Sequence, residues 1–213
     1  MRVLVACEYS GRVRDAFIAK GHDAVSCDLL PTRTEGPHYE GDVRDLLSLR
    51  FDLMIAFPPC TYLTTTGGRW FYHPDDKHLP RDERRAHPLY PNRRSDREQA
   101  VAFFRLLAEA SIHKIAIENP VGAMSTIYRK PDQIIQPYQF GHDASKATCL
   151  WLKNLPPLLP TKIVPVTRVT TSTGKTFSKW YWDTSQGKGA ERQLLRSLTF
   201  SGIAEAMAAQ WGR

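Results

Sequence analysis

Hydrophobic and polar positions alternate between strand-like and helix-like patterns through the first half of the chain. Short apolar runs predict buried strands over Arg2–Cys7, Ala24–Cys27 and Phe51–Ala56. Arg12–Lys20 has helical spacing, and Gly21 suits the C-terminal cap because glycine adopts a left-handed conformation without strain. Strands separated by helices predict a mostly parallel sheet covered on both faces, so we expect a doubly wound α/β fold.

A helix and a strand continue this pattern further along the chain. Apolar residues recur every three or four positions over Ser95–Ser111, which predicts a helix with Ser95 as N-cap and Glu98 completing a capping box. The apolar run Lys114–Ile117 predicts a short strand that leads into Glu118-Asn119-Pro120. We therefore expect another helix and strand in the same sheet.

Two segments lack a clear period. Residues 61–94 are rich in arginine, histidine, proline and aromatic residues, and we expect a long functional insertion or lid there. Residues 160–193 interleave basic and aromatic side chains, as nucleic-acid surfaces do. A solvated hairpin packed through its aromatic residues explains the same pattern. Beyond it, the one-sided apolar spacing of Ser201–Trp211 predicts a final helix.

The composition indicates a single globular domain over residues 1–213. The chain is 42% hydrophobic and 24% charged, which suffices for one sizeable core. Its net charge of +7 favours an acidic partner, most simply nucleic acid. No apolar run is long enough for a membrane span. The four cysteines have neither zinc spacing nor a disulfide pattern, so we expect a reducing compartment and no metal site.

The third predicted strand ends at Phe57-Pro58-Pro59-Cys60. Prolines stop a strand because they cannot donate to the sheet ladder. The thiol that follows therefore lies at the carboxyl end of a strand, where open α/β sheets bind ligands. Cys60 is a candidate nucleophile, and a small buried packing residue is the alternative. Glu118 ends the strand after the long helix and is expected at the same edge, as an acid or as a helix cap.

Other strand ends indicate a cofactor site. The turn Glu8-Tyr9-Ser10-Gly11 leads into a helix, and its small residues would let a ligand approach the backbone amides, although a simple turn is equally consistent. Asp28 ends the second strand, where an acidic residue accepts hydrogen bonds from ribose hydroxyls or caps a turn. Asp42 would lie beside an adenine edge or in a surface turn.

The order of these motifs resembles that of the DNA cytosine-5 methyltransferases. The Pro-Cys motif of that family is similar to Pro58-Pro59-Cys60, and its Glu-Asn-Val motif is similar to Glu118-Asn119-Pro120. Residues 144–151 and 196–204 are similar to compact versions encoded by phages and prophages. The resemblance covers nearly the whole chain. It implies one Rossmann-like domain that uses S-adenosylmethionine, in the cytoplasm of a bacterial or phage-infected cell.

The resemblance also implies residue roles. Cys60 would add to carbon 6 of a cytosine flipped out of DNA, expected as a duplex, and Glu118 would stabilise the adduct. Lys146 would substitute for an arginine of the family at the catalytic site. The residues expected to bind the cofactor are Glu8, Tyr9, Ser10, Gly11, Asp28, Asp42 and Pro58. The residues expected to bind the substrate are Asn119, Thr61, Thr148 and Arg69.

The chain departs from the family at several points. Thr61 stands where the family usually has glutamine, and the cofactor turn has one glycine instead of several. The target-recognition domain is absent or reduced to about residues 160–193, so we expect a relaxed or short target site. Arginines of the first insertion would aid DNA binding or lie on a solvated loop; they are Arg69, Arg81, Arg84, Arg85, Arg93 and Arg94.

Two alternative functions remain. The same fold would methylate a free pyrimidine nucleotide or RNA if the reduced recognition segment does not select DNA. A catalytically degenerate nucleic-acid-binding protein would explain the glycine-poor turn and Thr61.

Overall fold

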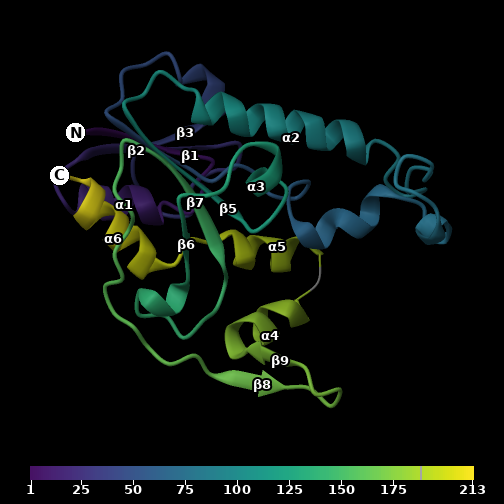
Figure 1. The fold of residues 1–213 in the computed structure, drawn as a ribbon. Helices are drawn as coiled ribbons and strands as arrows, with labels where there is room; N and C mark the ends of the chain where they lie inside the picture. Colours follow the sequence, from purple (N-terminus) through teal and green to yellow (C-terminus); the bar gives the residue numbers. More distant parts are fainter. Residues whose placement is uncertain (188) are drawn as a thin grey trace.

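A computed structural model describes residues 1–187 and 189–213. Within them, the main sheet has seven strands in the order β3-β2-β1-β4-β5-β7-β6 (Figure 1). Strands β1 to β5 are parallel, whereas β7 runs antiparallel to both β5 and β6. The expected α/β class with a mostly parallel sheet is confirmed. The strands are β1 (Arg2–Ala6), β2 (Asp23–Asp28), β3 (His38–Glu40), β4 (Leu53–Ala56), β5 (Lys114–Pro120), β6 (Gln133–Ile135) and β7 (Thr148–Lys153).

Helices cover both faces of the sheet. Helices α1 (Arg12–Ile18) and α6 (Ser201–Trp211) pack together on one face, and α2 (Arg93–Ala108) lies on the other (Figure 1). Side chains of a strand point alternately to the two faces, so Val3 and Val5 join the core under α1 and α6, while Leu4 joins the core under α2. The final helix has the predicted bounds.

The strand order reverses between β1 and β4. From β1 the chain proceeds outward through β2 to β3, and it returns to add β4 and β5 on the other side of β1. In open α/β sheets, ligands bind in the crevice that such a reversal leaves at the carboxyl ends of the strands. The turn after β1 and the turn after β4 both lie at this edge, which is where the sequence predicts the chemistry.

Two helix ends test the predicted caps. Gly21 has a φ of 81° and its amide donates to the Ile18 carbonyl, while the His22 amide donates to the Phe17 carbonyl. These bonds form the glycine cap that the sequence predicts after α1. The predicted N-cap at Ser95 is wrong, because α2 begins at Arg93 without a side-chain cap and Ser95 Oγ donates to a backbone carbonyl instead.

The segment of residues 61–94 contains more regular structure than its sequence suggests. It forms the 3₁₀ helices η2 (Thr65–Phe71) and η3 (Pro74–His78), and its last two residues already belong to α2. The insertion, residues 61–92, projects from the amino-terminal end of α2 (Figure 1). Short 3₁₀ turns have no apolar period, so the pattern did not reveal them.

The second aperiodic segment forms a hairpin and a helix. Strands β8 (Arg168–Thr170) and β9 (Thr176–Ser178) pair with each other and lead into α4 (Lys179–Gln186). The Phe177 ring stacks on Tyr181 at 5.4 Å and on Trp182 at 6.4 Å, as the alternative of an aromatic-packed hairpin predicts. Lys188 and the side chains at 190, 191 and 193 lie outside the described residues. Nucleic-acid binding by this segment remains a prediction.

The remaining helices are short. They are α3 (Met124–Ile127) and α5 (Gly189–Ser197), with a 3₁₀ turn at Val43–Asp45 and another at Pro137–Gln139. In the described part of the chain, no helix has both the length and the apolar character needed to cross a bilayer.

Candidate active site

The turn after β4 holds Cys60 on a rigid support. The strand ends at Ala56, and Pro58 is buried with its carbonyl accepting a hydrogen bond from Asn119 Nδ2 at 2.9 Å. The Cys60 carbonyl accepts the amides of Leu63 and Thr64, at 2.9 and 3.1 Å, which closes a tight turn. Asn119, expected to bind substrate, therefore positions the Cys60 turn through Pro58. Its Oδ1 is buried and has no partner within the described residues.

Two arginines of α2 anchor the residues that follow Cys60. Arg93 Nη2 donates to the Thr61 carbonyl and Arg97 Nε donates to the Tyr62 carbonyl, each at 3.0 Å. Arg93 is buried, with its guanidinium over the rings of Tyr62 and Phe71. The side chain of Thr61 is left exposed. Arg93 is thus a structural anchor, and sequence reasoning did not single out Arg97.

Other insertion arginines also hold the insertion together. Arg84 donates to the carbonyls of Leu79 and Lys77, and Arg85 forms an ion pair with Asp76 at 2.6 Å. These contacts correct the expectation that all six arginines face DNA or solvent. Within residues 1–187 and 189–213, neither a hydrogen bond nor an ion pair engages the side chains of Arg69 and Arg81.

Glu118 lines a pocket between β5, β7 and the segment before α6. Its neighbours in the pocket include Phe57, Lys146 and Thr148, so the turn after β4, strand β5 and the start of β7 all contribute. Burial raises the pKa of Glu118, against the opposing effects of the Lys146 ammonium and the Thr148 hydroxyl. A carboxyl group with a raised pKa can donate a proton or a hydrogen bond near neutral pH.

The charge of Glu118 also influences the Cys60 thiol. Burial raises its pKa, the Glu118 carboxylate raises it further, and Lys146 and Arg196 lower it. Glu118 and Lys146 line the same pocket, and the charges of both shift the pKa of the Cys60 thiol. Arg196 was missed as an individual residue, because it lies on α5, far along the chain from the strand ends.

A segment before α6 covers the Glu118 pocket. We call Leu194–Phe200 the covering segment, since residues 197–200 line the pocket. Lys146 Nζ donates to the Arg196 carbonyl at 3.0 Å, and Tyr9 Oη donates to the Leu194 carbonyl at 3.1 Å. Arg12 Nη1 donates to the Thr199 carbonyl at 2.7 Å. The hydroxyl of Tyr9, a residue expected to bind the cofactor, thus donates a hydrogen bond to the covering segment.

No protein-family model matches this chain, and a search of the curated proteins finds no match either. The assignment of function therefore depends on the chemistry of the site itself.

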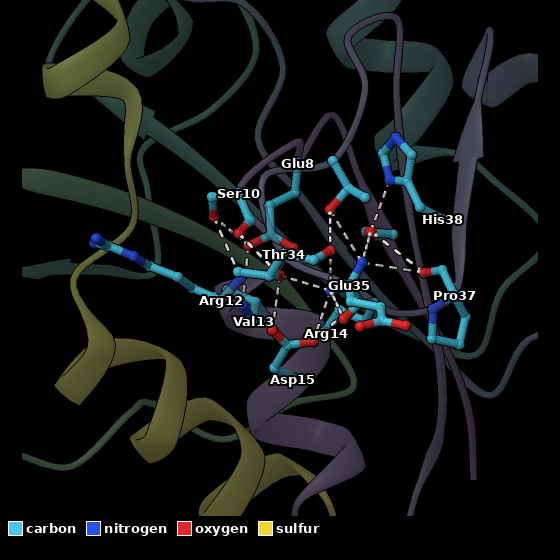
Figure 2. A network of polar contacts seen from close by, with 12 residues as sticks. Glu8, Ser10, Arg12, Val13, Arg14, Asp15, Thr34, Glu35, Pro37 and His38 are labelled. Carbon is cyan, nitrogen blue, oxygen red and sulfur yellow. Dashed lines mark hydrogen bonds and ion pairs between the residues drawn. The ribbon is translucent and has the colours of Figure 1, made fainter.

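The turn after β1 caps α1 with its own side chains (Figure 2). Glu8 is buried, and its Oε1 accepts the Ser10 hydroxyl at 2.7 Å and the Val13 amide at 2.9 Å. Ser10 Oγ accepts the Arg12 amide at 3.3 Å. These amides are the ones that a phosphate bound at the helix start would use. Glu8 Oε2 is left buried and without a partner within the described residues.

Gly11 packs closely against a neighbouring loop, as the simple-turn alternative allows. Its φ is 75°, and a Cβ at this position would overlap Thr34 Oγ1 and Arg14 Nη2. Arg14 is fully buried and donates to carbonyls of the Thr34–Pro37 loop (Figure 2). The glycine is needed because this loop packs against the turn.

Two aspartates stand at the same sheet edge. Asp28 Oδ1 accepts the Leu30 amide at 3.0 Å, and burial raises the pKa of this carboxyl. Asp42 caps the 3₁₀ turn at Val43–Asp45 and pairs with Arg44 at 3.0 Å, as a surface turn predicts. Burial raises the pKa of the nearby Cys7 thiol, and the negative charges of both aspartates raise it further.

The expected site residues thus fall into three groups. Glu118, Lys146 and Thr148 line one pocket, and Cys60 follows the end of β4, with the charges of Glu118 and Lys146 acting on its thiol. The turn after β1, Asp28 and Asp42 belong to the neighbouring edge of β1 to β3. Arg69 lies within the insertion over the Trp70 ring, 4.6 Å from its centroid, and does not line the Glu118 pocket. In the described part of the chain, no cluster of His, Cys, Asp and Glu side chains is arranged to hold a metal ion.

Proposed function

We propose that the protein is an S-adenosylmethionine-dependent DNA cytosine-5 methyltransferase with Cys60 as its nucleophile. The observation that carries the proposal is a pocket lined by Glu118 and Lys146 at the sheet edge where β4 ends before Cys60, with burial raising the pKa of Glu118 and nearby charges acting on the thiol. Addition of a thiolate to carbon 6 of cytosine needs these groups, because the ring must accept both a sulfur atom and a proton.

In the proposed mechanism, Glu118 would take up the thiol proton of Cys60. The Glu118 carboxylate raises the pKa of Cys60, so transfer of the thiol proton to Glu118 removes the charge that disfavours the thiolate. Glu118 would then donate that proton to N3 of cytosine while Cys60 sulfur bonds to carbon 6. Carbon 5 becomes nucleophilic and takes the methyl group of the donor, whose sulfur–methyl bond breaks to release S-adenosylhomocysteine. Loss of the carbon 5 proton to a base then breaks the C–S bond, and the N3 proton returns.

The turn after β1 supports the choice of cofactor class. S-adenosylmethionine would supply the electrophilic methyl group; it carries an ammonium and ribose hydroxyls and no phosphate. The amides at the start of α1 are already occupied, which disfavours a phosphate-containing cofactor, while Glu8 Oε2 and Asp28 are acceptors for ammonium and hydroxyl groups. Glu8 and Asp28 would hold it at this edge.

The direct experiment is to map modified cytosines in plasmid DNA from cells that express the protein. We expect 5-methylcytosine with the native chain, none with Cys60→Ala, and at least a hundredfold loss with Glu118→Gln, since general acid catalysis contributes about 10²–10⁴. Unfolding curves of both variants verify that they fold. Unchanged methylation by Cys60→Ala would refute the mechanism.

A second candidate is methylation of a free pyrimidine nucleotide or RNA by the same residues. It is favoured by the small size of the segment that would replace a recognition domain, a hairpin and one short helix. Parallel incubation of duplex DNA, RNA and dCMP with labelled methyl donor separates the candidates. Label in DNA supports our proposal, and label confined to dCMP or RNA supports the second candidate.

A further inference from the structure

A second hollow lies within the insertion, separate from the Glu118 pocket. Residues between Gly68 and His87 line it, and it contains about 600 Å³ of empty space, including the part open to solvent. Its enclosed part measures about 230 Å³, which is below the size of pockets that hold drug-sized ligands, so a ligand would lie partly in the open mouth of the hollow. The sequence placed Arg69 with the substrate of Cys60, whereas the structure places it here.

The hollow is positively charged. Arg69, Lys77 and Arg84 line it, and no carboxylate does. The Arg84 side chain already stabilises the loop, since it donates to the carbonyls of Leu79 and Lys77 at 2.7 and 2.8 Å. Among the described residues, no side-chain hydrogen bond or ion pair involves Arg69 or Lys77. These two cations are therefore available to an anion.

The aspartates that follow Pro74, Asp75 and Asp76, do not line the hollow, and neither do Asp82 and Glu83. Asp76 is buried and binds Arg85 through two hydrogen bonds to Oδ2, at 2.8 and 3.0 Å, and one to Oδ1 at 2.6 Å. Asp75 is exposed and lies 3.6 Å from His73. The Asp76–Arg85 pair fixes the loop without neutralising Arg69 or Lys77.

Aromatic rings form the wall beside these cations. Trp70 packs edge-on against His87 at 5.1 Å and Tyr90 at 5.4 Å, which fixes its orientation. The Arg84 guanidinium lies over the Tyr72 ring, and its central carbon is 5.6 Å from the ring centroid. The Arg69 guanidinium lies over the Trp70 ring, 4.6 Å from its centroid, so a nucleobase would stack on this guanidinium plane or on the part of the rings that the arginines leave uncovered.

We propose that this hollow binds one nucleotide of a nucleic-acid strand, with its phosphate on Arg69 and Lys77 and its base against the aromatic wall. The choice of a strand over a free nucleotide rests on the proposed function. The insertion begins directly after Cys60 and is anchored to α2 by Arg93 and Arg97. A nucleotide held here would belong to the strand that flanks the target cytosine.

The test compares Arg69→Ala with Arg81→Ala, both in the full-length chain without methyl donor. Each variant removes one exposed arginine from the same insertion, but Arg81 does not line the hollow. Binding of a fluorescent 12-nucleotide single strand is measured by anisotropy over a range of salt concentrations. We expect Arg69→Ala to weaken binding roughly fivefold and to reduce the salt slope by about 0.7, and Arg81→Ala to change neither.

Two further arms identify the ligand. Trp70→Ala should weaken binding of the strand further than Trp70→Phe, because phenylalanine preserves a stacking surface. Inorganic phosphate and dCMP are tested as competitors. Equal effects of Arg69→Ala and Arg81→Ala would overturn the proposal in favour of a diffuse cationic surface. Tight binding of dCMP that depends on Arg69, with strand binding unaffected, would also overturn it.

The outcome is independent of the methylation assay. If no cytosine is methylated but Arg69→Ala still weakens strand binding selectively, the proposed function fails and the hollow remains a nucleotide site. If methylation occurs and the two arginine variants behave alike, only the inference about the hollow fails.

Discussion

At the residue scale, the surroundings of Cys60 distinguish it from the other partly exposed cysteine. Burial raises the pKa of both thiols, but Cys7 has only negative neighbours, Asp28 and Asp42 among them, whereas the effect of Glu118 on Cys60 is opposed by Lys146 and Arg196. Reactive cysteines occupy partly exposed, electropositive positions. Cys27 and Cys149 are fully buried, and burial raises the pKa of Cys27 to about 12.

The coupling between Cys60 and Glu118 predicts how the thiol titrates. Glu118→Gln removes a negative neighbour and should lower the pKa of Cys60, so alkylation by iodoacetamide accelerates at lower pH than in the native chain. Lys146→Met removes a positive neighbour and should move the inflection to higher pH. The pH dependence of alkylation at Cys60, followed by peptide mass spectrometry, measures both shifts. Inflections that stay in place in both variants would contradict the geometry.

Sequence reasoning located the site at this scale only where a strand end indicated it. Cys60 and Glu118 follow buried strands, and parallel strands align such residues at one edge. Arg196 and the anchoring role of Arg93 depend on contacts between distant segments, which no local pattern encodes. Gly11 has the left-handed conformation of a turn, but only the structure reveals that Thr34 fills the space beside it.

At the scale of elements, the loops after β4 and β5 support each other. The Ala123 amide donates to the Leu63 carbonyl at 2.7 Å, and Thr64 pairs with Gly122 in an isolated bridge. Thr65 Oγ1 donates to the Val121 carbonyl at 3.2 Å. This pairing links the Cys60 turn to the segment that follows Glu118.

Gly122→Ala tests this link. A Cβ at Gly122 would overlap the Leu63 carbonyl, so the two loops must separate. We expect a loss of about 1–3 kcal/mol in the free energy of unfolding and reduced methylation through displacement of Cys60. Denaturant unfolding and the plasmid assay measure the two effects. Gly68→Ala, which meets no atom within 4 Å, is the control for stability. A Gly122→Ala chain as stable and active as the native one would contradict the link.

The covering segment gives a second prediction at this scale. Tyr9→Phe removes the hydroxyl that contacts the Leu194 carbonyl and Ser197 Oγ, at 3.1 and 3.2 Å. We expect a loss of about 1 kcal/mol in the free energy of unfolding. Amide exchange in residues 194–200 should be faster than in the native chain, while exchange in α6 stays the same. Hydrogen exchange with mass spectrometry measures the difference. Equal exchange rates for residues 194–200 in the variant and the native chain would show that Tyr9 does not hold the segment.

The elements differ in how well their sequences predict them. The last helix has a long one-sided apolar pattern and was predicted to the residue. The start of α2 was not, because Arg93 is held among the aromatic rings of the insertion. Strands of three residues, such as β3 and β6, are too short for a pattern of alternation to identify.

At the scale of the whole molecule, the sheet explains why distant residues meet. The reversal of strand order at β1 places the turn that contains Glu8 beside the turn that contains Cys60, while β5 and β7 add Glu118 and Thr148. The α/β class was predictable because the apolar runs alternate between two periods. The antiparallel direction of β7 was not, since direction depends on the connections.

The central claim is that Cys60 forms a covalent bond to carbon 6 of cytosine. It is tested most directly with duplex DNA that contains 5-fluorocytosine, because fluorine at carbon 5 cannot leave as a proton does and the adduct persists. We predict that, with methyl donor present, mass spectrometry finds the DNA attached to the peptide that contains Cys60, and that Cys60→Ala yields no adduct. Attachment at another residue, or methylation without any dependence on Cys60, would contradict the account.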